Sequence, residues 1–219
     1  MVALTKRVAV LGGAIALGLL LFYVAQPKSP DIPLIDATSK QLASHYDTPA
    51  GICPWRDQDA DMRTFFPTAT SHNERLIPLS SDRLEIEKRI GRHPTGEELG
   101  FPLHLIEKEK ALLGTIVAKR VRGDSGVIEI LLVLDAKGTL KDWKIQRLRE
   151  PEVAERFLRS ESFHRLFIGQ NGLDNSSVSL PKEVPTESRT SAKAVTETIR
   201  AVLILHSIAM RNYFKVHRA

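Results

Sequence analysis

The sequence predicts an α+β fold, in which an antiparallel sheet is covered by a long C-terminal helix. Over 125–151, aliphatic residues at every second position lead into a turn sequence and a second apolar segment, which indicates a strand pair. A helical apolar stripe over 191–214 indicates the covering helix. Short helical and extended patterns between residues 59 and 168 supply the remaining elements, so helices and antiparallel strands follow one another along one domain.

The segment 125–151 predicts a β-hairpin. Residues 128, 130, 132 and 134 are all aliphatic and share one face of an extended chain, as expected for a strand buried on that side. Asp135 and Gly138 then occupy the first and last positions of a type I turn, where glycine can take the positive φ of a bulged hairpin. A two-stranded ribbon is marginal in water, so other elements must cover its apolar face.

The residues before the hairpin predict two helices and two strands. A helix over 59–66 ends at Pro67, and a helix over 83–90 is capped by Ser81-Asp82 and ended by Gly91. Residues 94–100 are typical of a loop because of their Pro, Thr and Gly content. The expected strands span 102–107 and 112–120.

The residues after the hairpin lead to the closing helix. Pro151 suits the first turn of a helix that runs to about residue 159. A short apolar segment, 162–168, is followed by a loop over 170–184. The closing helix carries Val195, Ile199 and Val202 at helical spacing, which makes it the expected main cover of the sheet.

The N-terminus predicts a membrane anchor. Residues 1–7 carry Lys6 and Arg7 and are expected in the cytoplasm, since positive residues stay inside; the uncharged run 8–25 follows. A cleaved signal peptide is the alternative, although Tyr23 occupies a position that favours a small residue. The proline-rich stretch 26–58 is then a tether, 59–210 an extracytoplasmic (periplasmic) domain, and 211–219 a basic tail.

Composition excludes several classes of function. The chain has 219 residues, of which 42% are hydrophobic and 26% charged, as in ordinary globular proteins. Its net charge of +5 is spread along the chain, so no nucleic-acid partner is expected. The single cysteine, Cys53, excludes an intramolecular disulfide. The histidines show no i, i+4 pair and no nucleophile motif occurs, so no metal ligands or catalytic residues are assigned.

The stretch from Thr186 to Ser191 is the candidate binding site. Hydroxyls at a helix start can cap unpaired amides, and the same amides with the helix dipole can hold a phosphate. Arg189 and Lys193 add positive charge. A capped helix N-terminus in a polar loop explains the same residues without a ligand.

The order of these pieces resembles the FMN-binding domain of exported flavoprotein subunits in Rnf-type and sodium-pumping quinone oxidoreductase complexes. The likeness covers about residues 59–207 and is carried by the turn Asp135–Gly138, by Glu150-Pro151, and by the segments 65–67 and 157–169. It implies an electron-transfer or accessory subunit of a membrane complex, more than a stand-alone enzyme. The implied FMN-binding residues are Glu150, Thr186, Ser188, Arg189, Thr190, Ser191 and Lys193.

The attachment motif departs from the family's pattern, which leaves three hypotheses open. Glu187 stands at the family's glycine and Arg189 at the threonine that is esterified by the FMN phosphate, so non-covalent FMN is the first hypothesis. A shift of one residue would place Thr190 at the acceptor position. The second hypothesis is a structural or assembly subunit that keeps the fold without the cofactor. The third is an exported domain that binds another small anion at Arg189 and Lys193.

Overall fold

The computed structural model describes residues 54–173, 180–181 and 184–217. Its α-helices are α3 (Gln58–Phe65), α4 (Arg83–Ile90), α5 (Gly96–Leu99), α6 (Glu152–Leu158), α7 (Glu161–Arg165) and α8 (Arg189–His217). Its strands are β1 (Ser71–Pro78), β2 (Gly100–Lys108), β3 (Ala111–Arg122), β4 (Val127–Asp135) and β5 (Leu140–Arg147). Two 3-10 turns, η1 (Ser80–Asp82) and η2 (Thr186–Ser188), precede α4 and α8.

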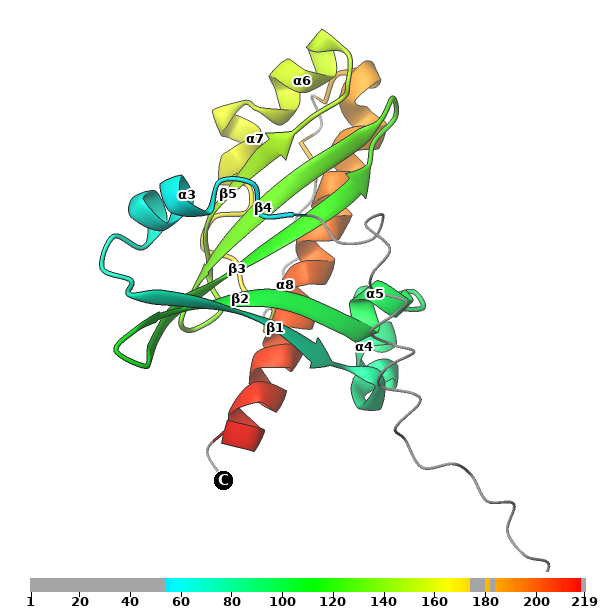
Figure 1. The fold of residues 1–219 in the computed structure, drawn as a ribbon. Coiled ribbons are helices and arrows are strands. Elements are labelled where there is room, and N and C mark those ends of the chain that lie inside the picture. Colours follow the sequence, from blue (N-terminus) through cyan, green and yellow to red (C-terminus); the bar gives the residue numbers. More distant parts are fainter. Residues whose placement is uncertain (1–53, 174–179, 182–183, 218–219) are drawn as a thin grey trace, which may run out of the picture. The chain divides into compact units, whose positions relative to one another are not determined.

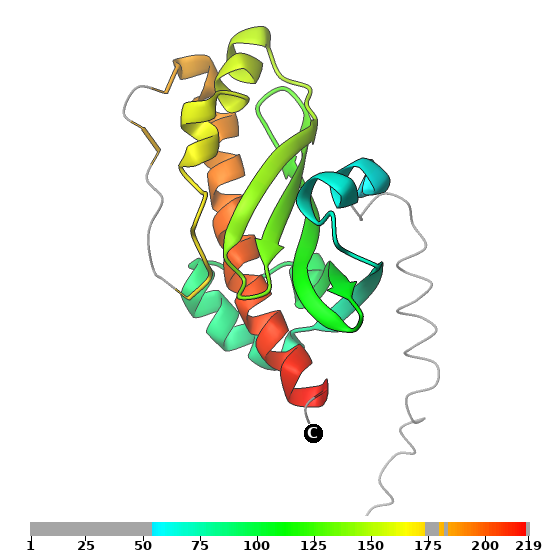
Figure 2. The same ribbon diagram turned by 90° about the vertical axis from the view of Figure 1, so that its left-hand side faces the viewer.

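The α+β prediction is confirmed. The five strands form one antiparallel sheet in the order β1-β2-β3-β4-β5, and α8 runs along one face of it (Figure 1). The turned view places α3 on the opposite side of the strands from α8 (Figure 2). Each strand pairs with its neighbour in the chain; the connections from β2 to β5 are short, whereas the β1–β2 connection contains η1, α4 and α5.

The predicted hairpin is β4 and β5. Residues 128, 130, 132 and 134 are fully buried toward α8, as their alternation predicts. Gly138 has φ +81°, the left-handed conformation that favours glycine. The Asp135 carboxylate accepts hydrogen bonds from the backbone N–H groups of Lys137 and Thr139 at 2.8 and 2.9 Å. The aspartate therefore fastens the turn that the glycine permits.

The sheet has an apolar cluster on each face. The larger one lies between the sheet and α8 and includes Phe101, Leu132, Trp143 and Val202. The smaller one lies under α3, where Trp55 and Phe66 cover aliphatic side chains of β2, β3 and β4. Because both faces of β4 are covered over most of its length, this strand is the centre of the fold.

Two elements differ from the prediction. β1 was not expected, because Ile77 alone of its eight side chains is buried and an exposed edge strand has little apolar alternation. Residues 94–100 contain the short helix α5 in place of a plain loop. Its start is a capping box, in which the Thr95 side chain and the Glu98 side chain each bind the other's backbone N–H.

The expected helix over 83–90 is confirmed as α4, but only part of its stripe is buried. Gly91 ends the helix with φ +80°. Ile86 is buried, whereas Leu84 is 83% exposed. Arg211 of α8 binds Asp82 and Glu85 beside this helix. The segment expected as a basic tail is helical up to residue 217, because residues 211–217 continue α8.

The predicted anchor, residues 8–25, and the tether up to residue 53 lie outside the described residues. Within the described part of the chain, no helix combines the length and the apolar character that a membrane crossing requires. The candidate functional site therefore lies in the domain from residue 54 onward.

Candidate functional site

The predicted site residues lie in two segments that meet in space. Glu150 is in the loop between β5 and α6, and the other six lie on η2 and the first turn of α8. α6 packs against η2, which brings the two segments together. Ser188 and Ser191 are buried, whereas the remaining four on this segment are exposed: Thr186, Arg189, Thr190 and Lys193.

Glu150 and Ser191 both bind the tight turn between β3 and β4. The Glu150 carboxylate accepts hydrogen bonds from the backbone N–H groups of Ser125 and Gly126, with Oε1 at 3.2 and 3.3 Å. Ser191 Oγ accepts one from the Asp124 N–H at 2.8 Å. A Cβ at Gly123 would overlap Glu150 Oε1 and lie 2.9 Å from Ser191 Oγ, so only glycine leaves room for both side chains.

We name this arrangement the turn clasp, meaning Glu150, Ser191 and the turn 123–126. Each backbone amide that it uses is a donor that would otherwise need water or another acceptor. The clasp ties the tip of the β3–β4 hairpin to the start of α8 and to the loop before α6. The turn clasp is therefore a structural junction. It uses two residues, Glu150 and Ser191, that were predicted to bind a ligand.

The remaining residues of the predicted site share no contact that directs them to one point among the described residues. Lys193 lies 3.8 Å from Glu197, its neighbour one helical turn on. Ser188 Oγ is buried and has no hydrogen-bond partner among the described residues. Phosphate binding at a helix start needs free donors that face a common centre. Of the hydroxyls predicted to meet the phosphate, Ser191 already binds the hairpin, so the fit to FMN is poor.

The strand ends beside the clasp carry an arginine array on the face of the sheet that also carries α3. Arg120 and Arg147 lie opposite Glu129 on either side of it, because both pair with it in the sheet. Arg122 lies opposite Val127 in the same register, and the backbone of Arg149 passes close to Gly126. Two adjoining hollows of about 440 and 460 Å³ cover this array. Arginines of β3, Glu129 of β4 and arginines of β5 and the following loop thus line one continuous surface.

Glu129 is the buried anion within the array. Its carboxylate lies 2.5 Å from Arg56 Nε and 3.6 Å from Arg120 Nε. The hydrogen bond from Arg56 lowers the pKa of Glu129, burial opposes this, and the charges of Arg120 and Arg147 add to the lowering. Glu129 therefore stays ionised and binds Arg56 and Arg120.

Three arginines of the array remain uncommitted. Arg122, Arg147 and Arg149 are exposed and make no hydrogen bond or ion pair with any residue that the structure describes. The lining of the two hollows contains four arginines and only two carboxylates, Glu129 and Asp124. The array thus has an excess of positive charge and guanidinium donors directed to solvent, which suits an anionic ligand.

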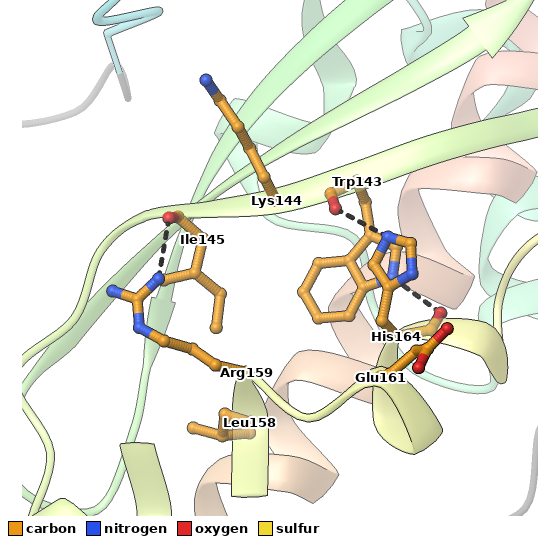
Figure 3. Close-up of a pocket in the computed structure, with 7 residues that line it drawn as sticks. All are labelled: Trp143, Lys144, Ile145, Leu158, Arg159, Glu161 and His164. Atoms are coloured by element: carbon orange, nitrogen blue, oxygen red, sulfur yellow. Dashed lines mark hydrogen bonds between the residues drawn. The ribbon is translucent and has the colours of Figure 1, made fainter. Parts of the chain in front are cut away.

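A third hollow, of about 460 Å³, lies between the outer edge of β5 and the helices α6 and α7 (Figure 3). Arg159 donates to the Ile145 carbonyl at 3.4 Å, and the Trp143 indole donates to the His164 carbonyl at 3.1 Å. His164 Nε2 lies 2.7 Å from Asp142 Oδ1 and 3.1 Å from the Trp143 carbonyl.

The polar side chains of this hollow are already paired within the domain. Arg159 also binds Glu155, Lys144 binds Asp61, and Glu161 binds Arg165. Arg159 and His164 also bind the Ile145 and Trp143 carbonyl groups of this edge strand, which would otherwise be open to pairing with another chain. The polar side chains of this hollow are thus already bound within the domain, so it has fewer free hydrogen-bond donors for a ligand than the arginine array.

His206, which is buried, and His104, which is half-buried, are packing residues. His206 of α8 is buried under the β4–β5 turn, and its Nε2 lies 2.7 Å from Thr115 Oγ1. Burial lowers the pKa of His206 to about 4, so the ring is neutral at pH 7. His104 packs edge-on against Trp55, and burial also lowers its pKa. Among the described residues, no group of three His, Cys, Asp or Glu side chains has the arrangement of a metal site.

The arginine array was missed by the sequence analysis, although a signal was present. Each of the two segments contains an Arg-x-Arg pair, at 120–122 and at 147–149. Alternation places both members of such a pair on one face of an extended chain. What the sequence alone did not supply was the strand order, which brings the two pairs to either side of β4.

Comparisons with known proteins add no family to this geometry. No protein-family model matches the chain, and no curated protein matches it either. The resemblance to FMN-binding domains therefore has no support from these comparisons. Function has to be inferred from the side chains and their contacts.

Proposed function

We propose that this chain is a membrane-anchored accessory subunit, whose α+β domain lies outside the cytoplasm and binds another subunit of a membrane complex without a flavin. The observation that carries the proposal is the turn clasp. Glu150 and Ser191 are hydrogen-bonded to the β3–β4 turn at the place where a flavodomain would use them for its cofactor. The anchor and the orientation are carried over from the apolar run 8–25 and the basic residues that precede it.

The chemistry of the helix start also favours this proposal over a flavin site. Glu187 is exposed beside the first turn of α8, where its negative charge would repel a phosphate. Turning Ser191 toward a ligand would leave the Asp124 N–H without its acceptor, at a cost of about 1–3 kcal/mol. Binding FMN here would therefore begin by breaking a contact that supports the fold.

Non-covalent FMN binding, with electron transfer as the function, is the second candidate. The observation in its favour is the buried Ser188 Oγ, which lacks a partner in the described structure at the start of α8. Arg189 and Thr190 are exposed on the adjoining turn and are able to reach a phosphate. FMN itself would supply the redox chemistry, and the protein would supply binding and orientation.

The accessory-subunit proposal is tested on the full chain, purified from membranes of its native host in a mild detergent. We expect it to elute in a complex of defined stoichiometry whose mass exceeds that of the 24.4 kDa chain. A cross-linker that acts between amines and carboxylates should then join the domain to the same partner subunit in separate preparations. Elution as a monomer at all detergent concentrations, with no reproducible cross-link, contradicts the proposal.

A further inference from the structure

We infer that the arginine array is the docking surface of this domain and that its partner is a protein segment in extended conformation with acidic residues at alternating positions. The inference rests on the proposed function, since it names the partner chemistry of an interaction subunit. The array is defined by Arg120, Arg122, Arg147 and Arg149 around Glu129 and Val127.

The array repeats at the spacing of an extended chain. Residues two apart along a strand share one face and lie about 6.5–7 Å apart, and this relation holds for Arg120 and Arg122 of β3. Arg147 ends β5, and Arg149 follows it in the loop that passes beside Gly126. Neighbouring strands lie about 4.8 Å apart, so β3 and β5, on either side of β4, lie about twice that distance from each other. An extended segment lying along β4 would meet a guanidinium on both sides at each second residue. A helix or a single small ion would match this two-by-two pattern less well.

The charges of the array favour carboxylates as the ligand groups. Arg122, Arg147 and Arg149 have guanidinium groups that no described residue occupies, and guanidinium binds a carboxylate through two parallel hydrogen bonds. Glu129 engages Arg56 and Arg120 and so leaves the other three for a partner. The excess positive charge also attracts an acidic segment before contact, which raises the association rate.

The centre of the array accepts an apolar side chain. Val127 is 44% exposed between the arginine pairs, directly after the glycine that ends the β3–β4 turn. Most other large apolar side chains of β4 are fully buried, so an exposed valine at this position is available for a contact. An aliphatic residue between two acidic ones would cover Val127 while its neighbours bind the arginines.

The surface is also held in one conformation, which lowers the entropic cost of binding. The turn clasp fixes the tip of the β3–β4 hairpin, and Glu129 fixes Arg120 and Arg56. The hollow at the β5 edge has no such free donors on a fixed surface, because its Arg159 and His164 side chains already bind backbone carbonyl groups. The array is therefore the better-prepared of the two surfaces.

The test uses the full chain in detergent and a fluorescent peptide of four Asp-Val repeats, with anisotropy as the measurement at low and high salt. We expect saturable binding that weakens as salt is added. The double variant Arg147→Gln, Arg149→Gln should bind at least about tenfold more weakly, because two bidentate contacts are lost. The matched control is Arg156→Gln, Arg165→Gln, which removes the same charge from α6 and α7 and should retain the affinity within about twofold.

Two further arms decide whether charge pattern and partner class are right. A peptide with the same composition but with its four Asp residues in one block should bind at least about threefold more weakly than the alternating peptide. Equal affinity for both peptides, or equal loss in both double variants, overturns the inference. Array-dependent binding to vesicles of phosphatidylserine and phosphatidylcholine, without peptide binding, overturns it in favour of a lipid surface. Circular dichroism and thermal unfolding of every variant exclude misfolding as the cause.

These outcomes are distinguishable from failure of the proposed function. A flavin bound to the native protein would contradict the cofactor-free subunit but would leave the arginine dependence of peptide binding measurable. Conversely, the protein could be flavin-free, belong to a membrane complex and fail to bind the alternating peptide. That result would support the proposed function and contradict the array as its docking surface.

Discussion

His206 illustrates at the scale of one residue how the long helix is matched to the sheet. Its ring is buried between α8 and the β4–β5 hairpin, and its Nε2 is hydrogen-bonded to Thr115 Oγ1. The other nitrogen faces Gly138, and a Cβ at that position would lie 3.2 Å from it. Burial lowers the pKa of His206 to about 4, and the charge of Asp135 acts weakly in the opposite direction. The neutral ring is therefore part of the core.

This pKa predicts that acid destabilises the protein through His206. Above pH 6.5 the ring is neutral in the folded and unfolded states; as pH falls toward 4, only the unfolded state gains the proton. Stability should thus fall over this window, by roughly 2 kcal/mol between pH 7 and pH 5. Urea unfolding at both pH values measures the loss, and His206→Gln should reduce it.

The control for this prediction is His93→Gln, because His93 is an exposed residue with no part in the core. The lowered pKa of His104 adds a loss of the same sign in every variant, so the comparison is between variants at the same two pH values. The same pH dependence in wild type and in His206→Gln would show that His206 does not carry the effect.

The predictability of each element depended on how much of its sequence pattern is local. The β4–β5 hairpin was predictable, because strand alternation and the Asp135–Gly138 turn lie within a few residues of each other. The end of α4 was predictable from Gly91, whereas the expected cap at its start is wrong, because the Asp82 side chain accepts no hydrogen bond from the first turn. α8 was predictable from its stripe. β1 was not, since an edge strand with one buried residue is defined by its partner β2 and not by its own sequence.

The candidate site was less predictable than the fold, for the same reason. Glu150 and Ser191 were singled out as ligand residues, and the structure does bring them close together. Their shared partner is the turn 123–126, which lies far from both in sequence. The arginine array likewise depends on the alignment of β3, β4 and β5. Neither a hydrogen bond nor a register between distant segments is encoded in the spacing of either segment alone.

The turn clasp predicts a stability effect at the scale of elements. Ser191→Ala removes the acceptor of the Asp124 N–H and should lower the free energy of unfolding by about 1–2 kcal/mol. The exchange of the Asp124 amide with solvent deuterium should become faster as well. Thr190→Ala is the matched control: it removes an exposed hydroxyl from the next position and should stay within about 0.5 kcal/mol of wild type. A stable Ser191→Ala protein with a slowly exchanging Asp124 amide would speak against the clasp.

At the scale of the whole molecule, the proposed anchor predicts how the chain partitions in cells. Full-length protein should remain with the membranes after extraction at alkaline pH, because residues 8–25 form an uncharged apolar run. A chain that begins at residue 26, expressed without a leader, should appear in the soluble fraction. Intact mass decides between anchor and cleaved signal peptide: the anchor predicts that residues 1–25 are retained. Recovery of the full-length chain in the alkaline supernatant contradicts an anchor.

The surfaces of the sheet differ in how far other elements cover them, and this difference bears on the proposed role. One face is filled by α8, and the other is partly covered by α3 and its apolar cluster. The free edge of β5 is closed by side chains of α6 and α7. This leaves the arginine array as a charged surface supported by a rigid sheet, which is suited to binding a partner more than to enclosing a cofactor.

The measurement that tests the central claim most directly is the visible absorption spectrum, together with the intact mass, of full-length protein purified from its native host. An interaction subunit without flavin predicts no flavin absorption in the visible range, for native or denatured protein, and no mass beyond that of the polypeptide. Stoichiometric flavin, whether released on denaturation or retained as extra mass on the chain, would contradict the account.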